Sequence, residues 1–136
     1  MSYPRIDCRR VNIKPLASRK NKHQIDEIRI DPDAALPPVT SRQKANIAKV
    51  AGWIRTARAQ GAAVMLAYGA HMVKNGLGPV VVRMMEEGWI THLATNGAGV
   101  IHDWEYAFQG QSEEDVRAHV AQGQFGTWDE TGRHTH

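Results

Sequence analysis

The sequence predicts an α/β fold built around a parallel sheet, and three features support this fold class. Two continuous apolar runs, at residues 62–68 and 89–95, have the length and composition of strands that are buried on both faces. The segment between them opens a helix at Gly78-Pro79, as the crossover between parallel strands requires. Core-like apolar patterning is confined to residues 45–120, so we expect the fold in the second two-thirds of the chain.

Residues 1–42 show little apolar periodicity and carry a cluster of basic side chains: Arg5, Arg9, Arg10, Lys14, Arg19, Lys20 and Lys22. We therefore predict an extended basic N-terminal arm over residues 1–39 and a partial α/β nucleotide-binding domain over residues 40–136. A basic arm is able to contact nucleic acid. Apart from Tyr3, however, it lacks aromatic residues, and no known nucleic-acid module surrounds it. We expect a solvated extension that packs on a partner subunit, and we do not expect nucleic acid as a partner.

Length and cysteine content narrow the class of protein further. The chain of 136 residues corresponds to about one domain. Its single cysteine, Cys8, excludes an internal disulfide and fits a reducing cytosol. No apolar signal region follows Met1, and no stretch approaches the roughly 18 apolar residues that span a bilayer. We expect a cytoplasmic protein with no membrane contact.

The first predicted helix begins at Thr40 or Ser41, either of which is able to cap it, and runs to about Gln60, before Gly61. Its apolar positions follow helical spacing and form one stripe: Ile47, Val50, Ala51, Ile54 and Ala57. We expect this stripe to face the core.

Three further segments complete the predicted order of elements. The crossover helix runs from about Pro79 to Glu87, and a later helix runs from near Val100 through Phe108. Residues 112–115 resemble a capping box that opens a last helix ending at Gly123. Residues 124–132 are interpreted as a loop that covers the core, with Asp129 and Glu130 solvated; a lid over the site is the alternative.

Two glycine-containing loops follow the predicted strands, Tyr68-Gly69-Ala70-His71 and Asn96-Gly97-Ala98-Gly99. Parallel α/β sheets bind ligands in the crevice at the carboxyl ends of their strands. Glycines let the backbone approach a phosphate closely, and the helix that follows directs free N–H groups toward it. Residues 97–102 carry two of the three glycines of the dinucleotide fingerprint, with His102 in the third position. A phosphate cradle and a plain tight turn both remain open at this point.

Histidines and carboxylates near these loops are candidates for acid–base chemistry or for metal binding. Residues 102–105 lack the i, i+4 histidine pair of the zinc helix motif, so we predict no metal site. His92 lies inside a strand and is interpreted as a core histidine. His102 and Asp103 begin a helix along the crevice, and we predict that they contact the substrate.

The two loop segments resemble the deoxyhypusine synthase family, in particular its bacterial deoxyhypusine synthase-like branch. Residues 71–77, His-Met-Val-Lys-Asn-Gly-Leu, resemble the family's Asn-Leu-Ile-Ser-Ser-Gly-Ile stretch, and residues 95–103, Thr-Asn-Gly-Ala-Gly-Val-Ile-His-Asp, resemble its Thr-Thr-Ala-Gly-Gly-Val-Glu-Glu-Asp stretch. The spacing between them is also similar, and the match runs from about residue 60 to residue 108. The resemblance implies a Rossmann-like NAD-binding fold and transfer of an aminobutyl group from spermidine through NAD and a lysine imine. It further implies NAD contacts by Ala70, His71, Asn96, Gly97 and Ala98.

The chain departs from the family in two respects. The family's paired glutamates are here Ile101 and His102, which puts spermidine in doubt because a buried ammonium needs a paired charge. Members of the family are far longer, and their imine lysine and later glycine-rich loop lie beyond residue 136. Lys74, the lysine nearest the crevice, matches a serine of the family.

We therefore expect a truncated N-terminal part of an NAD-dependent transferase that acts on an amine or another small molecule and is inactive alone. As partners we expect other copies in a homo-oligomer or a complementing C-terminal chain. Two alternatives come from other classes: a non-catalytic nucleotide-binding or assembly module, and a histidine- or metal-dependent hydrolase that uses His71, His102 and Asp103.

Overall fold

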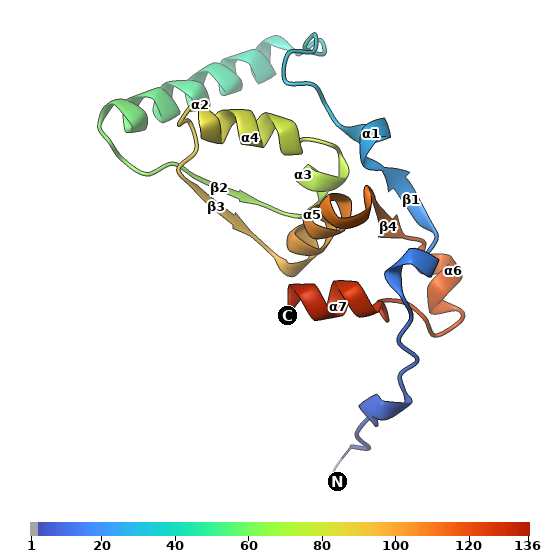
Figure 1. Ribbon diagram of the computed structural model, residues 1–136. Helices are drawn as coiled ribbons and strands as arrows, with labels where there is room; N and C mark the ends of the chain where they lie inside the picture. Colours follow the sequence, from blue (N-terminus) through green and yellow to red (C-terminus); the bar gives the residue numbers. More distant parts are fainter. Residues whose placement is uncertain (1–2) are drawn as a thin grey trace.

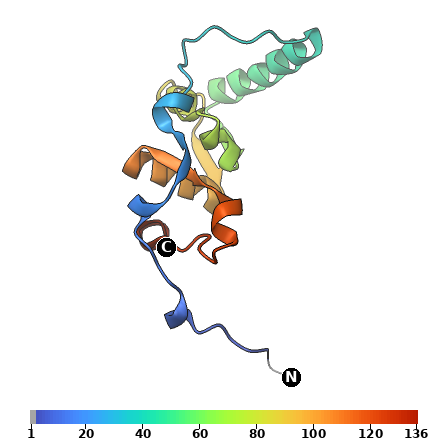
Figure 2. The ribbon, with the colours of Figure 1, turned by 90° about the vertical axis from the view of Figure 1, so that its right-hand side faces the viewer.

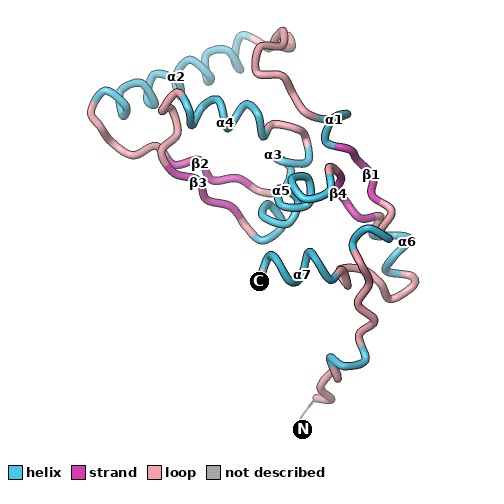
Figure 3. Tube along the Cα trace, viewed as in Figure 1, coloured by secondary structure: helices cyan, strands magenta, loops and turns pink. Residues whose placement is uncertain are grey.

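The computed structural model describes residues 3–136 and shows a mixed α/β fold with two small sheets (Figure 1). One sheet pairs β2 (Met65–Tyr68) with β3 (His92–Thr95), and the other pairs β1 (Asn21–Gln24) with β4 (Gln111–Glu114). The helices, shown in cyan in Figure 3, are η1 (Cys8–Arg10), η2 (Leu16–Ser18), α1 (Ile25–Ile28), α2 (Ser41–Ala59), α3 (Ala70–Lys74), α4 (Gly78–Glu86), α5 (Gly97–Gln109), α6 (Val116–Val120) and α7 (Asp129–Thr135). None of the helices in this part of the chain is both long and apolar enough to cross a membrane.

The predicted parallel strand pair is confirmed. Met65 lies opposite His92 and Tyr68 lies opposite Thr95, so β2 and β3 run in the same direction. The predicted crossover helix is α4, which begins at Gly78 with Pro79 in its first turn. The short helix α3 precedes it, so the connection contains two helices. Each strand is four residues long and occupies only the end of its apolar run.

The expectation that these strands are buried on both faces is wrong. The side chains of Met65 and Leu93 are 65% and 41% exposed. The sheet has only two strands within residues 3–136, so each strand keeps an open edge. His92, which we interpreted as a core histidine, is also exposed, and its Nδ1 lies 2.8 Å from the Thr91 hydroxyl. An apolar run thus identified the strands but not their burial.

Helix α2 begins where the sequence predicts and has the predicted cap, but its apolar stripe does not reach a core. Thr40 Oγ1 accepts a hydrogen bond from the Gln43 amide at 3.2 Å, and Gln43 Oε1 accepts one from the Thr40 amide at 2.9 Å. Ile47 and Val50 are nevertheless 59% and 47% exposed. The helix projects along the edge of the molecule and contacts few other elements (Figures 1 and 2). Its apolar side is therefore open in this chain.

The predicted solvated arm is correct for its first residues and wrong for its second half. Residues 3–13 are exposed and extend away from the fold (Figure 2). Leu16, in contrast, is fully buried, and Arg19 is 7% exposed. Strand β1 then pairs antiparallel with β4, with Asn21 opposite Glu114. This half of the arm is held by the backbone pairing of β1 and by two buried side chains, the apolar Leu16 and the charged Arg19. Neither contact requires a repeating apolar pattern, so the arm lacks apolar periodicity.

Residues 112–115, predicted to open a helix, belong instead to strand β4 and the turn after it. Gly110, with φ +72°, ends α5 and lets the chain reverse into the strand. Asp115 is the residue that caps α6, because its side chain accepts hydrogen bonds from the amides of Arg117 and Ala118. An acidic residue therefore caps a helix in this region, but the cap lies three residues later than predicted. Residues 112–114 are not helical because they pair with strand β1 of the arm.

Helix α5 is the centre of the fold and packs against α3, β4 and α7 (Figure 1). It begins at Gly97, earlier than the predicted Val100. A Cβ on Gly99 would lie 2.0 Å from the Thr95 hydroxyl oxygen, so α5 approaches the end of β3 more closely than any residue with a side chain allows. This contact places the start of α5 directly at the edge of the parallel sheet.

Candidate functional site

The two predicted cofactor loops lie together at the carboxyl edge of the β2–β3 sheet. The Thr95 hydroxyl, at the end of β3, donates a 3.0 Å hydrogen bond to the Tyr68 carbonyl at the end of β2. A Cβ on Gly69 would lie 3.7 Å from Nδ2 of Asn96, so the loops touch. Ala70 and His71 begin α3, and Asn96 immediately precedes α5.

The start of α5 offers free backbone donors. The Asn96 side chain accepts the Gly99 amide at 3.0 Å, while the amides of Gly97 and Ala98 have no hydrogen-bond partner within residues 3–136. All of these residues except Gly99 are exposed, and a Cβ on Gly97 would meet nothing within 4 Å. An anionic group is therefore able to approach these amides.

A cavity of about 360 Å³ lies along one face of α5. Ala98, Ile101, His102 and Glu105 line it from the helix, at the spacing that puts residues on one side of a helix. Its other walls come from the arm, α3, β4, the segment that leads into α7 and α7 itself, and include Arg19, Lys22, Lys74, Glu113, Phe125, Trp128 and Thr131. Ala98 belongs both to this cavity and to the second cofactor loop, so the two places adjoin.

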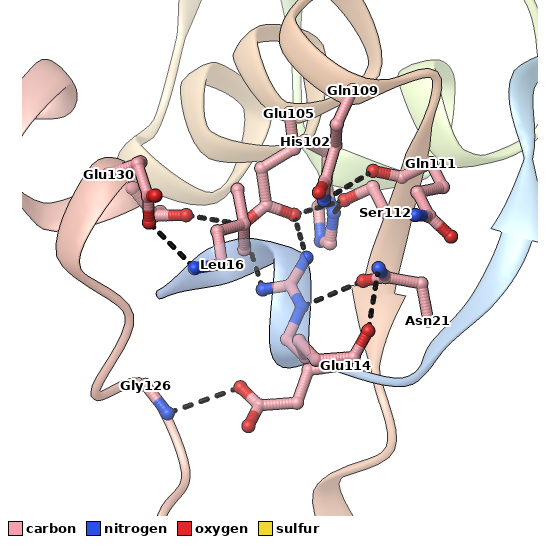
Figure 4. A network of polar contacts seen from close by, with 12 residues as sticks. Leu16, Asn21, His102, Glu105, Gln109, Gln111, Ser112, Glu114, Gly126 and Glu130 are labelled. Carbon is pink, nitrogen blue, oxygen red and sulfur yellow. Dashed lines mark hydrogen bonds and ion pairs between the residues drawn. The ribbon is translucent and has the colours of Figure 1, made fainter. Parts of the chain in front are cut away.

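A buried polar network, drawn in Figure 4, includes several residues that line this cavity. The Glu105 carboxylate, on a residue only 1% exposed, receives two hydrogen bonds from the Arg19 guanidinium at 2.8 and 2.5 Å. The hydroxyls of Ser112 and Thr131 also donate to it, at 2.5 and 2.8 Å. Burial opposes the charged form, but these donors and the positive charge of Arg19 together hold the pKa of Glu105 below its ordinary value. Glu105 is therefore an ionised carboxylate.

His102 joins this network from the side of the cavity. Its Nδ1 lies 2.8 Å from the Ser112 hydroxyl oxygen. Burial is the main cause that lowers the pKa of His102 below its ordinary value of 6.5, and the positive charge of Lys74 acts in the same direction. His102 is consequently neutral near pH 7.

Lys74 reaches the cavity from α3, and its amino group is engaged in an ion pair. Its Nζ lies 2.9 Å from Oε1 of Glu113, and His23 Nε2 lies 3.4 Å from the other oxygen of that carboxylate. Burial raises the pKa of Glu113, but the hydrogen bond and charge of Lys74, with His23 and Lys22, hold it below its ordinary value. The pair thus keeps a carboxylate charged at the cavity wall.

The predicted substrate residues His102 and Asp103 do not lie together. His102 lines the cavity, whereas Asp103 is exposed and is not part of the lining. Successive residues of a helix point about 100° apart, so one of two neighbours turns away. His71 is likewise exposed on α3, and the trio of the hydrolase alternative is not assembled around the cavity. Across residues 3–136, no group of three or more histidine, cysteine, aspartate or glutamate side chains is placed to hold a metal ion.

Sequence reasoning missed Arg19 and Ser112 as parts of this site. On sequence alone, Arg19 belongs to the predicted basic arm and Ser112 to a predicted helix cap. The ion pair of Arg19 with Glu105 joins residues 86 positions apart, and no local pattern signals such a pair. The sequence feature that indicates a partner of this kind is the isolated carboxylate of Glu105 on the inner face of a helix, because a buried acid needs a cation or several hydrogen-bond donors.

No protein-family model, no curated protein and no solved structure matches this chain. Its function is therefore inferred from the two loops, the cavity and the resemblance of the loop segments.

Proposed function

We propose that the chain forms the NAD-binding N-terminal part of a deoxyhypusine synthase-like transferase, with β2, the two crossover helices and β3 as the start of a Rossmann-like sheet. The observation that carries this proposal is the meeting of the two loops at the carboxyl edge of a parallel strand pair. That edge is where such sheets bind nucleotides. The loops come from segments more than twenty residues apart, and both resemble stretches of the same family in the same order.

The residues at this edge fit a dinucleotide. The open space over Gly97 and the two free amides of Gly97 and Ala98 suit a phosphate at the start of α5. Ala70, His71 and Asn96 belong to the two loops at this edge and would contact the remainder of the cofactor. When bound, NAD would supply a hydride acceptor.

Gly97→Val is expected to abolish or strongly weaken NAD binding without loss of folding. The added side chain meets no protein atom within 4 Å, so it is tolerated by the fold, but it fills the space through which a phosphate reaches the amides. The measurement is calorimetric titration of NAD into the native and variant chains.

Gly52→Val is the matched control for this variant. Gly52 lies in α2, away from the loops, and a Cβ there also meets nothing within 4 Å. We expect the control to bind NAD like the native chain. Equal affinities of the Gly97 variant and the native chain, or no binding by the native chain, would contradict the proposal.

The amine substrate is proposed to occupy the cavity along α5. Ile101, Phe125 and Trp128 offer apolar walls for a carbon chain, and His102 offers a polar contact. We propose that this chain alone does not carry the transferred group, since imine formation needs a free, deprotonated lysine. Lys74 is the lysine that the sequence predicts to lie nearest the crevice. Its amino group is engaged in the ion pair with Glu113, which supports this proposal.

We also propose that a second copy of the chain covers the apolar side of α2. Ile47 and Val50 of the apolar stripe, and Trp53 on the same helix, are 47–61% exposed, and exposed apolar side chains gathered on a polar helix are typical of an interface. Light scattering is expected to give the mass of a dimer or larger oligomer, and Trp53→Glu is expected to shift it toward the monomer.

Leu36→Glu provides the control, because Leu36 is 91% exposed but lies in the linker before α2. It should leave the mass unchanged. A native chain that is monomeric at every concentration would remove self-association and would leave a complementing chain, or the assembly-module alternative, to account for the stripe.

A cytoplasmic location is proposed for the protein as well. The thiol of Cys8 is free and exposed. Free exposed thiols persist in the reducing cytosol, which supports this location.

A further inference from the structure

We propose that His102 presents an unprotonated Nε2 to the cavity along α5, held in that form by Ser112 and Glu105, and takes a proton there from the amine substrate. The identity of the substrate rests on the proposed function. The tautomer and the accessibility of Nε2 rest on the network alone.

The hydrogen-bond chain determines which nitrogen of His102 carries the proton. Glu105 is ionised and bound by Arg19, so its oxygens only accept hydrogen bonds. The single hydroxyl hydrogen of Ser112 is donated to Glu105 Oε2 at 2.5 Å. The Ser112 oxygen must therefore accept at its 2.8 Å contact with His102 Nδ1, and Nδ1 must carry a hydrogen. In a neutral ring, Nε2 then holds a lone pair.

Nε2 is open to the cavity. It has no hydrogen-bond partner within residues 3–136, and it is not among the enclosed, unpartnered polar atoms of that part of the chain. His102 itself lines the cavity. A ligand in the cavity is thus able to donate a hydrogen bond to this nitrogen.

The charges that face His102 come from every element around it. Lys74 on α3 and Arg19 in the arm disfavour an added proton, while Glu105 on α5 and Glu113 on β4 favour one. Lys22 on β1 and His136 after α7 line the same cavity. Burial is the largest single influence on the pKa of His102 and favours the neutral ring, while a proton gained from a ligand is stabilised by the two nearby carboxylates.

The proposed step is a simple proton transfer. A substrate ammonium donates one proton to Nε2, which leaves a neutral amine and an imidazolium whose Nδ1–H still donates to Ser112. The freed lone pair on the substrate nitrogen is what loss of a hydride from the neighbouring carbon requires. His102 thus deprotonates the substrate nitrogen, while Ser112 and Glu105 act as positioning residues that orient the His102 ring.

Nitrogen NMR of the histidine-labelled full chain tests the tautomer directly. At pH 7 we expect His102 Nδ1 to carry hydrogen and Nε2 to give the signal of an unprotonated ring nitrogen. Ser112→Ala removes the acceptor and is expected to shift His102 toward the Nε2–H form. A protonated Nε2 in the native chain would overturn the inference, even if the Ser112→Ala variant does not fold.

A second measurement avoids any change in the buried network. Lys74→Met is expected to raise the pKa of His102 in an NMR titration, since it removes a positive charge and frees Glu113. Lys49→Met on α2, where the amino group lies over the Trp53 ring, is the control and should cause no shift. An unchanged His102 titration in Lys74→Met would show that His102 does not face this cavity as proposed.

The same spectra distinguish this inference from the proposed function. Butylamine, added as a probe, should move the His102 Nε2 signal toward the protonated form, and His102→Gln should abolish specific binding of the probe. No response to the amine in a chain that binds NAD would remove the proton-transfer role alone. An amine response without NAD binding would leave this role and remove the cofactor proposal.

Discussion

Arg19→Ala is expected to lower the free energy of unfolding by about 3–5 kcal/mol, because removal of one partner leaves a buried charge without compensation. The side chains of Arg19 and Glu105 are 3% and 1% exposed, and two hydrogen bonds join them. Ser112 and Thr131 remain bonded to the carboxylate in the variant, but neither supplies a positive charge. Denaturant unfolding followed by tryptophan fluorescence measures the loss, since Arg19 lies 5.6 Å from the centre of the Trp128 ring.

Two controls separate burial from charge in this experiment. Arg9→Ala breaks an ion pair with Asp7 at the surface, where solvent screens the charges, and should leave the unfolding curve unchanged. The double variant Arg19→Met, Glu105→Leu removes both charges and should be more stable than either single variant. An Arg19 variant as stable as the Arg9 variant would show that the pair does not hold the arm on α5.

The same pair makes stability depend on pH in a defined direction. The pKa of Glu105 in the folded chain lies below the ordinary glutamate value of 4.5. Its ionised form therefore contributes stability above about that value, and the contribution is lost as the pH falls through it toward the folded-state pKa. Arg19→Ala should flatten this acid dependence.

Gly76→Ala is expected to destabilise the fold by about 2–5 kcal/mol, from a left-handed backbone and a steric overlap together. Gly76 has φ +74°, and a Cβ there would lie 1.9 Å from the Ile28 carbonyl oxygen. The neighbouring Ile30 amide donates to the Gly76 carbonyl at 2.9 Å, so the same contact ties the arm to the turn before α4. Because the overlap is with backbone atoms, the arm must move to relieve it.

Gly61→Ala is the matched control, since Gly61 has φ +66° but a Cβ there meets nothing within 4 Å. We expect it to cost about 1–2 kcal/mol, the backbone contribution alone. The difference between the two variants measures the contact of the arm with residue 76. Equal losses would mean that residues 28–30 do not pack closely on this turn.

Local patterns were sufficient for the elements whose partners are near in sequence. The two apolar runs identified β2 and β3, Thr40 and Gln43 marked the start of α2, and Pro79 marked the start of α4. Helix caps, helix ends and the crossover connection depend on residues that are close together in the chain, so they can be predicted from the sequence. The meeting of the two glycine loops followed from parallel strand order for the same reason.

Burial and long-range pairing depended on the tertiary structure. The exposure of Met65 and the open stripe of α2 depend on which surfaces the rest of the molecule covers, and an apolar pattern does not contain that information. Strand β4 forms because it pairs with β1, a segment of the arm that lies far earlier in the chain. Arg19 becomes the cation of Glu105 only because β1 fixes the arm beside α5. Opposite charges attract at short distance whatever their separation in sequence, so this buried pair, and the tautomer of His102 that follows from it, were decided by the folded chain alone.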